Sequence, residues 1–89
     1  MGKVEAFEID GMDCWFWSQD HGPPHFNAKR KGQWCCKVFF LLPRQRMLVR
    51  ARGPRGRIAA HDRRALCDMA ERHRAELLGE WERKVQCDD

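Results

Sequence analysis

The hydrophobic pattern changes its period once along the chain, near residue 58. Before this point apolar and polar side chains alternate in short runs, which is the pattern of half-buried strands. Beyond it, one apolar stripe recurs at steps of three and four residues, the spacing of a helix face: Leu66, Ala70, His73, Leu77 and Trp81. We therefore predict an α+β fold, in which a small antiparallel β-sheet of about four to five short strands is packed by one long C-terminal α-helix.

Turns rich in glycine and proline divide the first half of the chain into five expected strands, at residues 3–10, 12–18, 25–29, 34–42 and 45–52. The run 34–42 is apolar on both faces, which is typical of a strand in the middle of a sheet. In the last run, alternation predicts that Met47, Val49 and Ala51 point inward and that the arginines between them point outward.

The length of 89 residues leaves room for a single domain, 1–89, with a sheet region (1–52), a loop (53–58) and the C-terminal helix (59–86). No apolar run approaches the roughly 20 residues that cross a bilayer, and the N-terminus lacks the pattern of a signal peptide. The cysteines are odd in number, which favours reduced thiols, and the absence of a CxxC pair gives no support to a zinc ribbon or a thioredoxin-like site. We expect a cytoplasmic protein with no cofactor and no membrane contact.

Basic side chains are concentrated in one block of the chain. The formal net charge is +4, but residues 43–64 alone carry eight arginines against Asp62, a local charge of +7. Arginine is suited to two-point contact with carboxylate or phosphate groups. We predict a partner-binding surface formed by Arg44, Arg46, Arg50, Arg52, Arg55 and Arg57. The alternative is a solvated strand edge that keeps a small protein soluble.

A rigid turn follows the tryptophan-rich run and contains Asp20, His21, Pro23, Pro24 and His25. Three interpretations remain open. The two histidines would bind a metal with Cys14 or Cys35 as third ligand; one histidine would act in recognition or as an acid or base; or the turn would hydrogen-bond itself and dock on the sheet. No nucleophile–base pair and no phosphate-binding loop stands out, so we predict no catalytic residue and no enzymatic activity.

The same turn resembles the signature of a known family. Residues 16–26, with their Asp-His-Gly-Pro-Pro-His core, are similar to the domain-of-unknown-function family numbered 4160, and residues 71–81 are similar to the closing helix of that family. The resemblance implies a compact cytoplasmic protein without assigned catalysis, often in a two-gene, toxin–antitoxin-like module. Asn27 replaces the last histidine of the motif, which weakens a metal role. Ala59 replaces the serine that would cap the helix, so the cap falls to Asp62 or to the loop backbone.

These features together predict a non-enzymatic interaction or regulatory protein that binds a protein partner through its arginines. One alternative is a nucleic-acid-binding protein that holds the phosphate backbone with the same arginines. A second alternative is a metal-binding protein at His21 and His25. The tryptophans would serve either as core residues or as stacking surfaces for bases: Trp15, Trp17, Trp34 and Trp81. The oligomeric state is left open.

Overall fold

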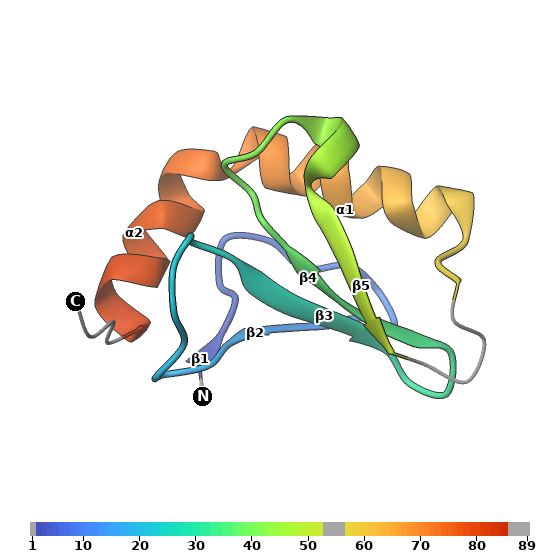
Figure 1. Cartoon of the computed structure of the whole chain (residues 1–89), viewed down its shortest axis with the longest axis horizontal. Coiled ribbons are helices and arrows are strands. Elements are labelled where there is room, and N and C mark those ends of the chain that lie inside the picture. Colours follow the sequence, from blue (N-terminus) through green and yellow to red (C-terminus); the bar gives the residue numbers. More distant parts are fainter. Residues whose placement is uncertain (1, 53–56, 86–89) are drawn as a thin grey trace.

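The computed structural model describes residues 2–52 and 57–85, apart from the side chains of residues 50–52. Its elements follow in the order β1 (Gly2–Lys3), β2 (Asp13–Phe16), β3 (Phe26–Arg30), β4 (Trp34–Val38), the 3-10 turn η1 (Arg44–Arg46), β5 (Leu48–Arg52), α1 (Ala60–Arg72) and α2 (Arg74–Lys84) (Figure 1). The strands form one antiparallel sheet in the order β1-β2-β3-β4-β5. The α+β class and the antiparallel sheet are therefore confirmed.

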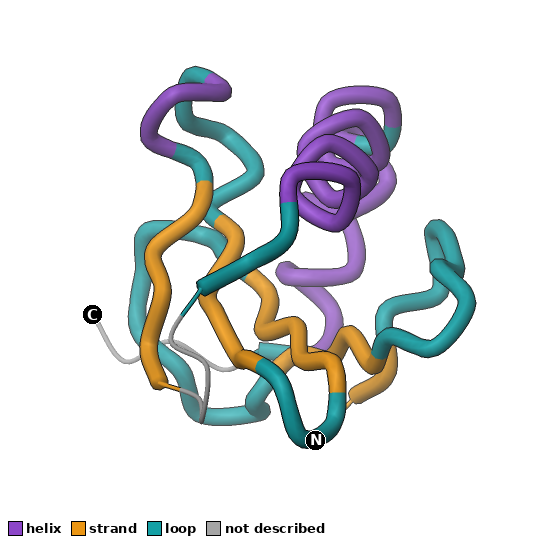
Figure 2. Tube along the Cα trace, turned by 90° about the vertical axis from the view of Figure 1, so that its right-hand side faces the viewer, coloured by secondary structure: helices purple, strands orange, loops and turns teal. Residues whose placement is uncertain are grey.

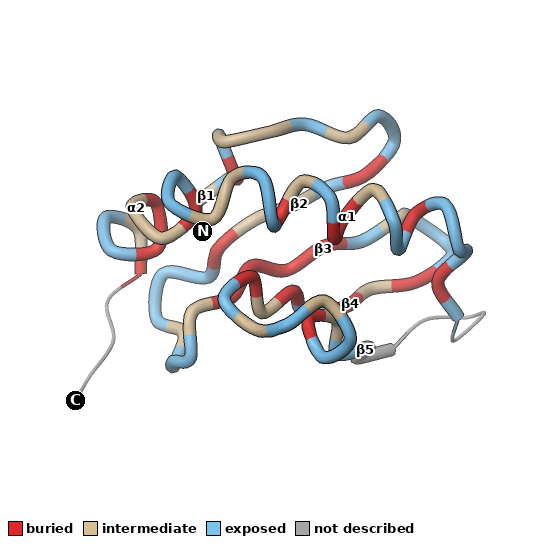
Figure 3. The backbone as a smooth tube through the Cα atoms, turned by 90° about the horizontal axis from the view of Figure 1, so that it is seen from above, coloured by how far each residue is buried: buried red, intermediate tan, exposed pale blue. Residues whose placement is uncertain are grey.

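The two helices cover one face of this sheet (Figures 1 and 2). Alternate strand residues point toward the helices, and a fully buried apolar layer fills the space between them: Phe16, Phe26 and Val38 from the strands, Leu66 and Leu77 from the helices. Seen from above, the buried stretch of β3 lies beneath the helices (Figure 3). Removal of this apolar surface from water is the main driving force for the two-layer packing.

The expectation of one long helix over residues 59–86 is wrong, because the helix is split at His73. This residue has φ −111° and ψ 23°, outside the helical region, so that α1 ends before it and α2 begins after it. Arg74 holds the bend: its Nε donates to the carbonyl oxygen of Phe40 at 2.7 Å and its Nη2 to that of Leu42 at 3.1 Å. Neither helix, within the described residues, is long and apolar enough to cross a membrane.

The first expected strand, 3–10, is much shorter than its alternation suggests. β1 has two residues and one further backbone hydrogen bond to β2, from Val4 N–H to the carbonyl oxygen of Cys14 at 3.0 Å, because the next two backbone donors bond to a side chain of α2. Oε1 and Oε2 of Glu80 accept hydrogen bonds from the N–H groups of Glu5 and Ala6, both at 2.8 Å. Glu80 is 3% exposed, so this contact is part of the interior.

The region from β4 to β5 also differs in part from expectation. β4 lies between β3 and β5, so the predicted central position of the run 34–42 is confirmed, although the strand ends at Val38. The predicted inward position of Val49 is wrong. Met47 is buried, but Val49 is 49% exposed. The turn η1 replaces the start of the expected strand and changes the phase of the alternation after Met47.

Replacement of Trp81 by alanine tests the packing of α2 on the sheet. Trp81 is 7% exposed and its ring centroid lies 6.4 Å from that of Phe16. We expect Trp81→Ala to lower the free energy of unfolding by about 3–5 kcal/mol, because it leaves a cavity between the layers. Urea denaturation followed by circular dichroism measures this change. Trp17→Ala is the control, since Trp17 is half exposed and should cost less than about 1 kcal/mol. Equal unfolding midpoints for Trp81→Ala and the unchanged protein would contradict the packing.

Candidate functional site

The start of α1 is anchored to the sheet by a buried carboxylate. Asp62 is 2% exposed, and Arg30 of β3 donates to it from Nε at 3.0 Å and from Nη2 at 2.8 Å. Trp34 Nε1 donates a weaker bond at 3.4 Å, and His61 Nε2 lies 3.3 Å away. Hydrogen bonding to the Arg30 guanidinium lowers the pKa of Asp62, against the opposite effect of burial. Asp62 is therefore not the helix cap, and the N-cap residue Ala59 makes no side-chain hydrogen bond.

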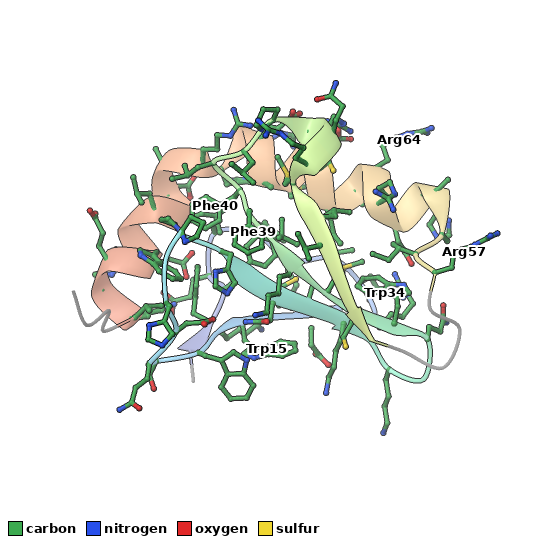
Figure 4. All side chains as sticks on the ribbon, viewed as in Figure 1. Trp15, Trp34, Phe39, Phe40, Arg57 and Arg64 are labelled. Carbon is green, nitrogen blue, oxygen red and sulfur yellow. The ribbon has the colours of Figure 1, made fainter. Side chains whose placement is uncertain are left out.

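A hollow of about 650 Å³ lies between η1 and the first turns of α1. We call it the arginine hollow, because four of the residues that line it are Arg44, Arg57, Arg63 and Arg64. Figure 4 shows Arg57 and Arg64 extending outward at this end of the molecule. The first backbone N–H groups of α1 lie at the same end, where the helix dipole is positive. The arginine hollow therefore favours negatively charged groups.

The four arginines differ in their partners. Arg44 is held between two carboxylates of α1, with its terminal nitrogens 2.6 Å from Asp68 Oδ1 and 2.6 Å from Glu71 Oε1. These contacts tie η1 to α1 and neutralise the guanidinium. The other three arginines are exposed, and no carboxylate among the described residues forms an ion pair with them. Their charges are available to an external anion.

The structure brings together only part of the predicted arginine surface. Arg44 and Arg57 line the arginine hollow, whereas Arg46 is exposed in η1 and does not line it. The other predictions fall outside what the structure describes, namely the side chains of Arg50 and Arg52 in β5 and the whole of Arg55. Arg63 and Arg64 were missed as site residues. The signal for them is that the basic block continues into the first turns of the expected helix.

The turn from Asp20 to His25 is bound to itself and to the core. His25 is 3% exposed, and its Nδ1 donates to the carbonyl oxygen of Pro23 at 2.9 Å. Its Nε2 lies 2.7 Å from Oδ2 of Asp20. The imidazole packs against Phe39 and Trp81, with ring centroids 4.7 Å and 5.5 Å away. These contacts support the interpretation that the turn docks on the sheet.

The metal interpretation requires ligands that the turn does not bring together. Both ring nitrogens of His25 face other groups and His21 is exposed. Across residues 2–52 and 57–85, no three His, Cys, Asp or Glu side chains form a group that could hold a metal. Burial, reinforced by neighbouring thiols, raises the pKa of Cys14 and of Cys36 to about 12, so these thiols stay protonated.

The tryptophans separate into two pairs. Trp34 and Trp81 are buried in the core. Trp15 and Trp17 lie on the sheet face that the helices leave uncovered, with their ring centroids 5.9 Å apart in an edge-to-face arrangement (Figure 4 labels Trp15). A second hollow of about 560 Å³, the indole hollow, is lined by these two rings and by apolar side chains of the segment between β1 and β2.

The family described as Domain of unknown function (DUF4160) matches residues 11–82. Since this segment is most of the 89 residues, the chain belongs to that family, as the Asp-His-Gly-Pro-Pro-His turn predicts. The matched segment contains the turn, both tryptophans of the uncovered face and all residues that line the arginine hollow. No curated protein and no solved structure matches the chain.

The Arg30–Asp62 pair predicts acid sensitivity. Because the pKa of Asp62 is lowered by folding, its stabilising contribution is complete above the ordinary carboxyl pKa of about 4 and is lost as the pH falls below it. We expect Asp62→Asn to cost about 2–4 kcal/mol at neutral pH and to flatten the loss of stability below about pH 4. Urea denaturation at a series of pH values measures both effects. Glu82→Gln is the control at an exposed carboxylate that forms no ion pair among the described residues. An unchanged acid slope in Asp62→Asn would contradict the assignment.

The docking of the turn predicts a local effect of Asp20. We expect Asp20→Ala to cost about 1–2 kcal/mol and to speed hydrogen exchange in residues 18–25, because it removes the carboxylate that lies beside the buried imidazole of His25. Hydrogen exchange read by mass spectrometry reports the change by segment. His21→Ala, at an exposed side chain of the same turn, serves as the control and should leave exchange unaltered. Equal protection in the two variants would exclude the docking contact.

Proposed function

We propose that this chain is a non-enzymatic regulatory protein that binds an acidic protein partner through the arginine hollow. The observation that carries the proposal is the set of exposed arginines at this hollow, Arg57, Arg63 and Arg64, which have no carboxylate partner among the described residues. Three uncompensated cations around one concave surface steer the approach of an oppositely charged molecule and favour partners with carboxylates.

The lining of the hollow favours a protein over a nucleic acid. Guanidinium groups make two-point contacts with carboxylates as well as with phosphates, so charge alone does not separate the two partners. No described residue that lines the hollow is aromatic, which leaves a base without a stacking surface there. Ile58 and Cys67, both buried, supply an apolar floor against which an anchoring side chain of a partner would pack.

The partner is an acidic protein encoded beside this chain, as a toxin–antitoxin-like module would supply. In such a pair the arginines set the rate and selectivity of association, and a few buried contacts set the lifetime of the complex. The turn from Asp20 to His25 has a structural role in this proposal, since its contacts are made within the chain.

The test replaces the three exposed arginines together, as Arg57→Gln, Arg63→Gln and Arg64→Gln. We expect the variant to keep its fold, because these side chains are exposed and make no described ion pair. A tagged form should fail to capture the partner from its own host after nuclease treatment, whereas the unchanged protein captures it. Mass spectrometry identifies the captured protein, and titration with the purified partner should show affinity lower by about 10-fold or more in the variant.

A matched control removes three exposed lysines instead, as Lys29→Gln, Lys31→Gln and Lys37→Gln. The lysine variant has the same change in net charge as the arginine variant. If it still captures the partner, the loss in the arginine variant is due to the arginine hollow and not to the overall charge. Loss of all captured material on nuclease treatment would contradict the proposal, because it would show that the arginines bind the phosphate backbone of a nucleic acid. Equal capture by the arginine and lysine variants would also contradict it.

A further inference from the structure

The sheet face away from the helices carries a continuous row of side chains. The strand register places Lys3 opposite Trp15, Trp15 opposite Asn27, Asn27 opposite Lys37, and Lys37 opposite Val49. Residues directly opposite in antiparallel strands project from the same face, so the row crosses all five strands. Figure 2 shows both helices on the other side of the strands. Cations and apolar groups are thus combined on a face that no described helix covers.

The indole rings beside this row provide a stacking surface. Trp17 is 49% exposed, and it meets the ring of Trp15 edge to face. The Nζ atom of Lys29 lies 5.7 Å from the centroid of the Trp15 ring. The adjoining indole hollow, at about 560 Å³, has the size of sites that enclose small planar ligands. A nucleobase is such a ligand, and every base stacks on an indole.

The charge of this face favours an anionic occupant. Lys3, Lys29 and Lys37 are exposed on it, while Glu8 pairs with Lys3 at 3.6 Å and Asp13 stands opposite Lys29. Lys37 has no ion-pair partner among the residues that the structure describes. A second copy laid on the same face would set lysines against lysines, whereas phosphates complement them.

We propose that the uncovered sheet face binds single-stranded nucleic acid. A base stacks on Trp17 at the indole hollow, and phosphates are held by Lys29 and Lys37. A single strand is required because the bases of a duplex are stacked on each other and do not reach a sheet face. This surface is separate from the arginine hollow, so it adds a second partner to the proposed function and does not depend on the first.

Binding of a fluorescein-labelled, single-stranded RNA of about ten nucleotides and mixed sequence tests the proposal by fluorescence anisotropy. We expect Trp17→Ala to weaken binding by about 10-fold and Trp17→Phe to restore most of it, because phenylalanine still stacks. Lys29→Gln combined with Lys37→Gln should lower the slope of log affinity against log salt by about one to two. The triple arginine variant is the control, and its affinity for this RNA should be nearly unchanged.

Indole N–H signals in NMR spectra locate the contact independently. The Trp15 and Trp17 signals should shift on RNA addition, whereas the Trp34 signal, whose N–H bonds to Asp62, should stay in place. Absence of RNA binding at low salt, equal binding of a duplex of the same sequence, or an unchanged affinity in Trp17→Ala would each overturn the proposal. Loss of RNA binding in the triple arginine variant alone would assign the RNA to the arginine hollow and equally overturn it.

Discussion

The position of α1 depends on the ion pair between Arg30 and Asp62. Transfer of a carboxylate out of water costs several kcal/mol, and here that cost is offset by two hydrogen bonds from one guanidinium and by the positive end of the helix. Since Arg30 ends β3 and Asp62 stands in the first turn of α1, the pair decides where the helix begins over the sheet. Arg44 adds a second connection between η1 and α1. Arg44 also lines the arginine hollow, so the contact that ties η1 to α1 contributes to the shape of this hollow.

The two layers of the fold separate two kinds of basic surface. Arginines gather where η1 meets α1, on the helix side of the sheet. Lysines and indoles gather on the opposite face. Arginine offers a planar fork of donors that matches both carboxylates and phosphates, whereas lysine is a point charge that donates to an anion in many orientations. The net positive charge of the chain is thus divided between an arginine surface and a lysine surface, and a variant that changes only one of them leaves the other available for comparison.

The sequence predicts the α+β class correctly, but it does not predict where helices and strands end when long-range hydrogen bonds set those ends. The change of period near residue 58 predicts strands followed by helix, and this is what the chain forms. It does not reveal the break at His73, because the apolar stripe continues across the bend while Arg74 bonds to carbonyls more than thirty residues away. A long-range contact also explains the short β1, since the Glu80 carboxylate accepts hydrogen bonds from the N–H groups of Glu5 and Ala6. For the candidate site, the basic block contains all four arginines that line the hollow, but only Arg44 and Arg57 were predicted to form the surface. Arg63 and Arg64 were missed because their position beside η1 depends on the anchoring of α1 through Asp62.

The contact of Glu80 with the N-terminal segment has a consequence for synthesis of the chain. The N–H groups of Glu5 and Ala6 are synthesised some 75 positions before the carboxylate that accepts their hydrogen bonds. Until α2 has formed, these two donors remain bonded to water, and β1 is held to β2 by its short ladder and by the hydrogen bond from Val4 N–H to the carbonyl oxygen of Cys14. A short edge strand that lacks its further anchor is the kind of surface that pairs with other nascent chains. Formation of α2 therefore secures this edge of the sheet.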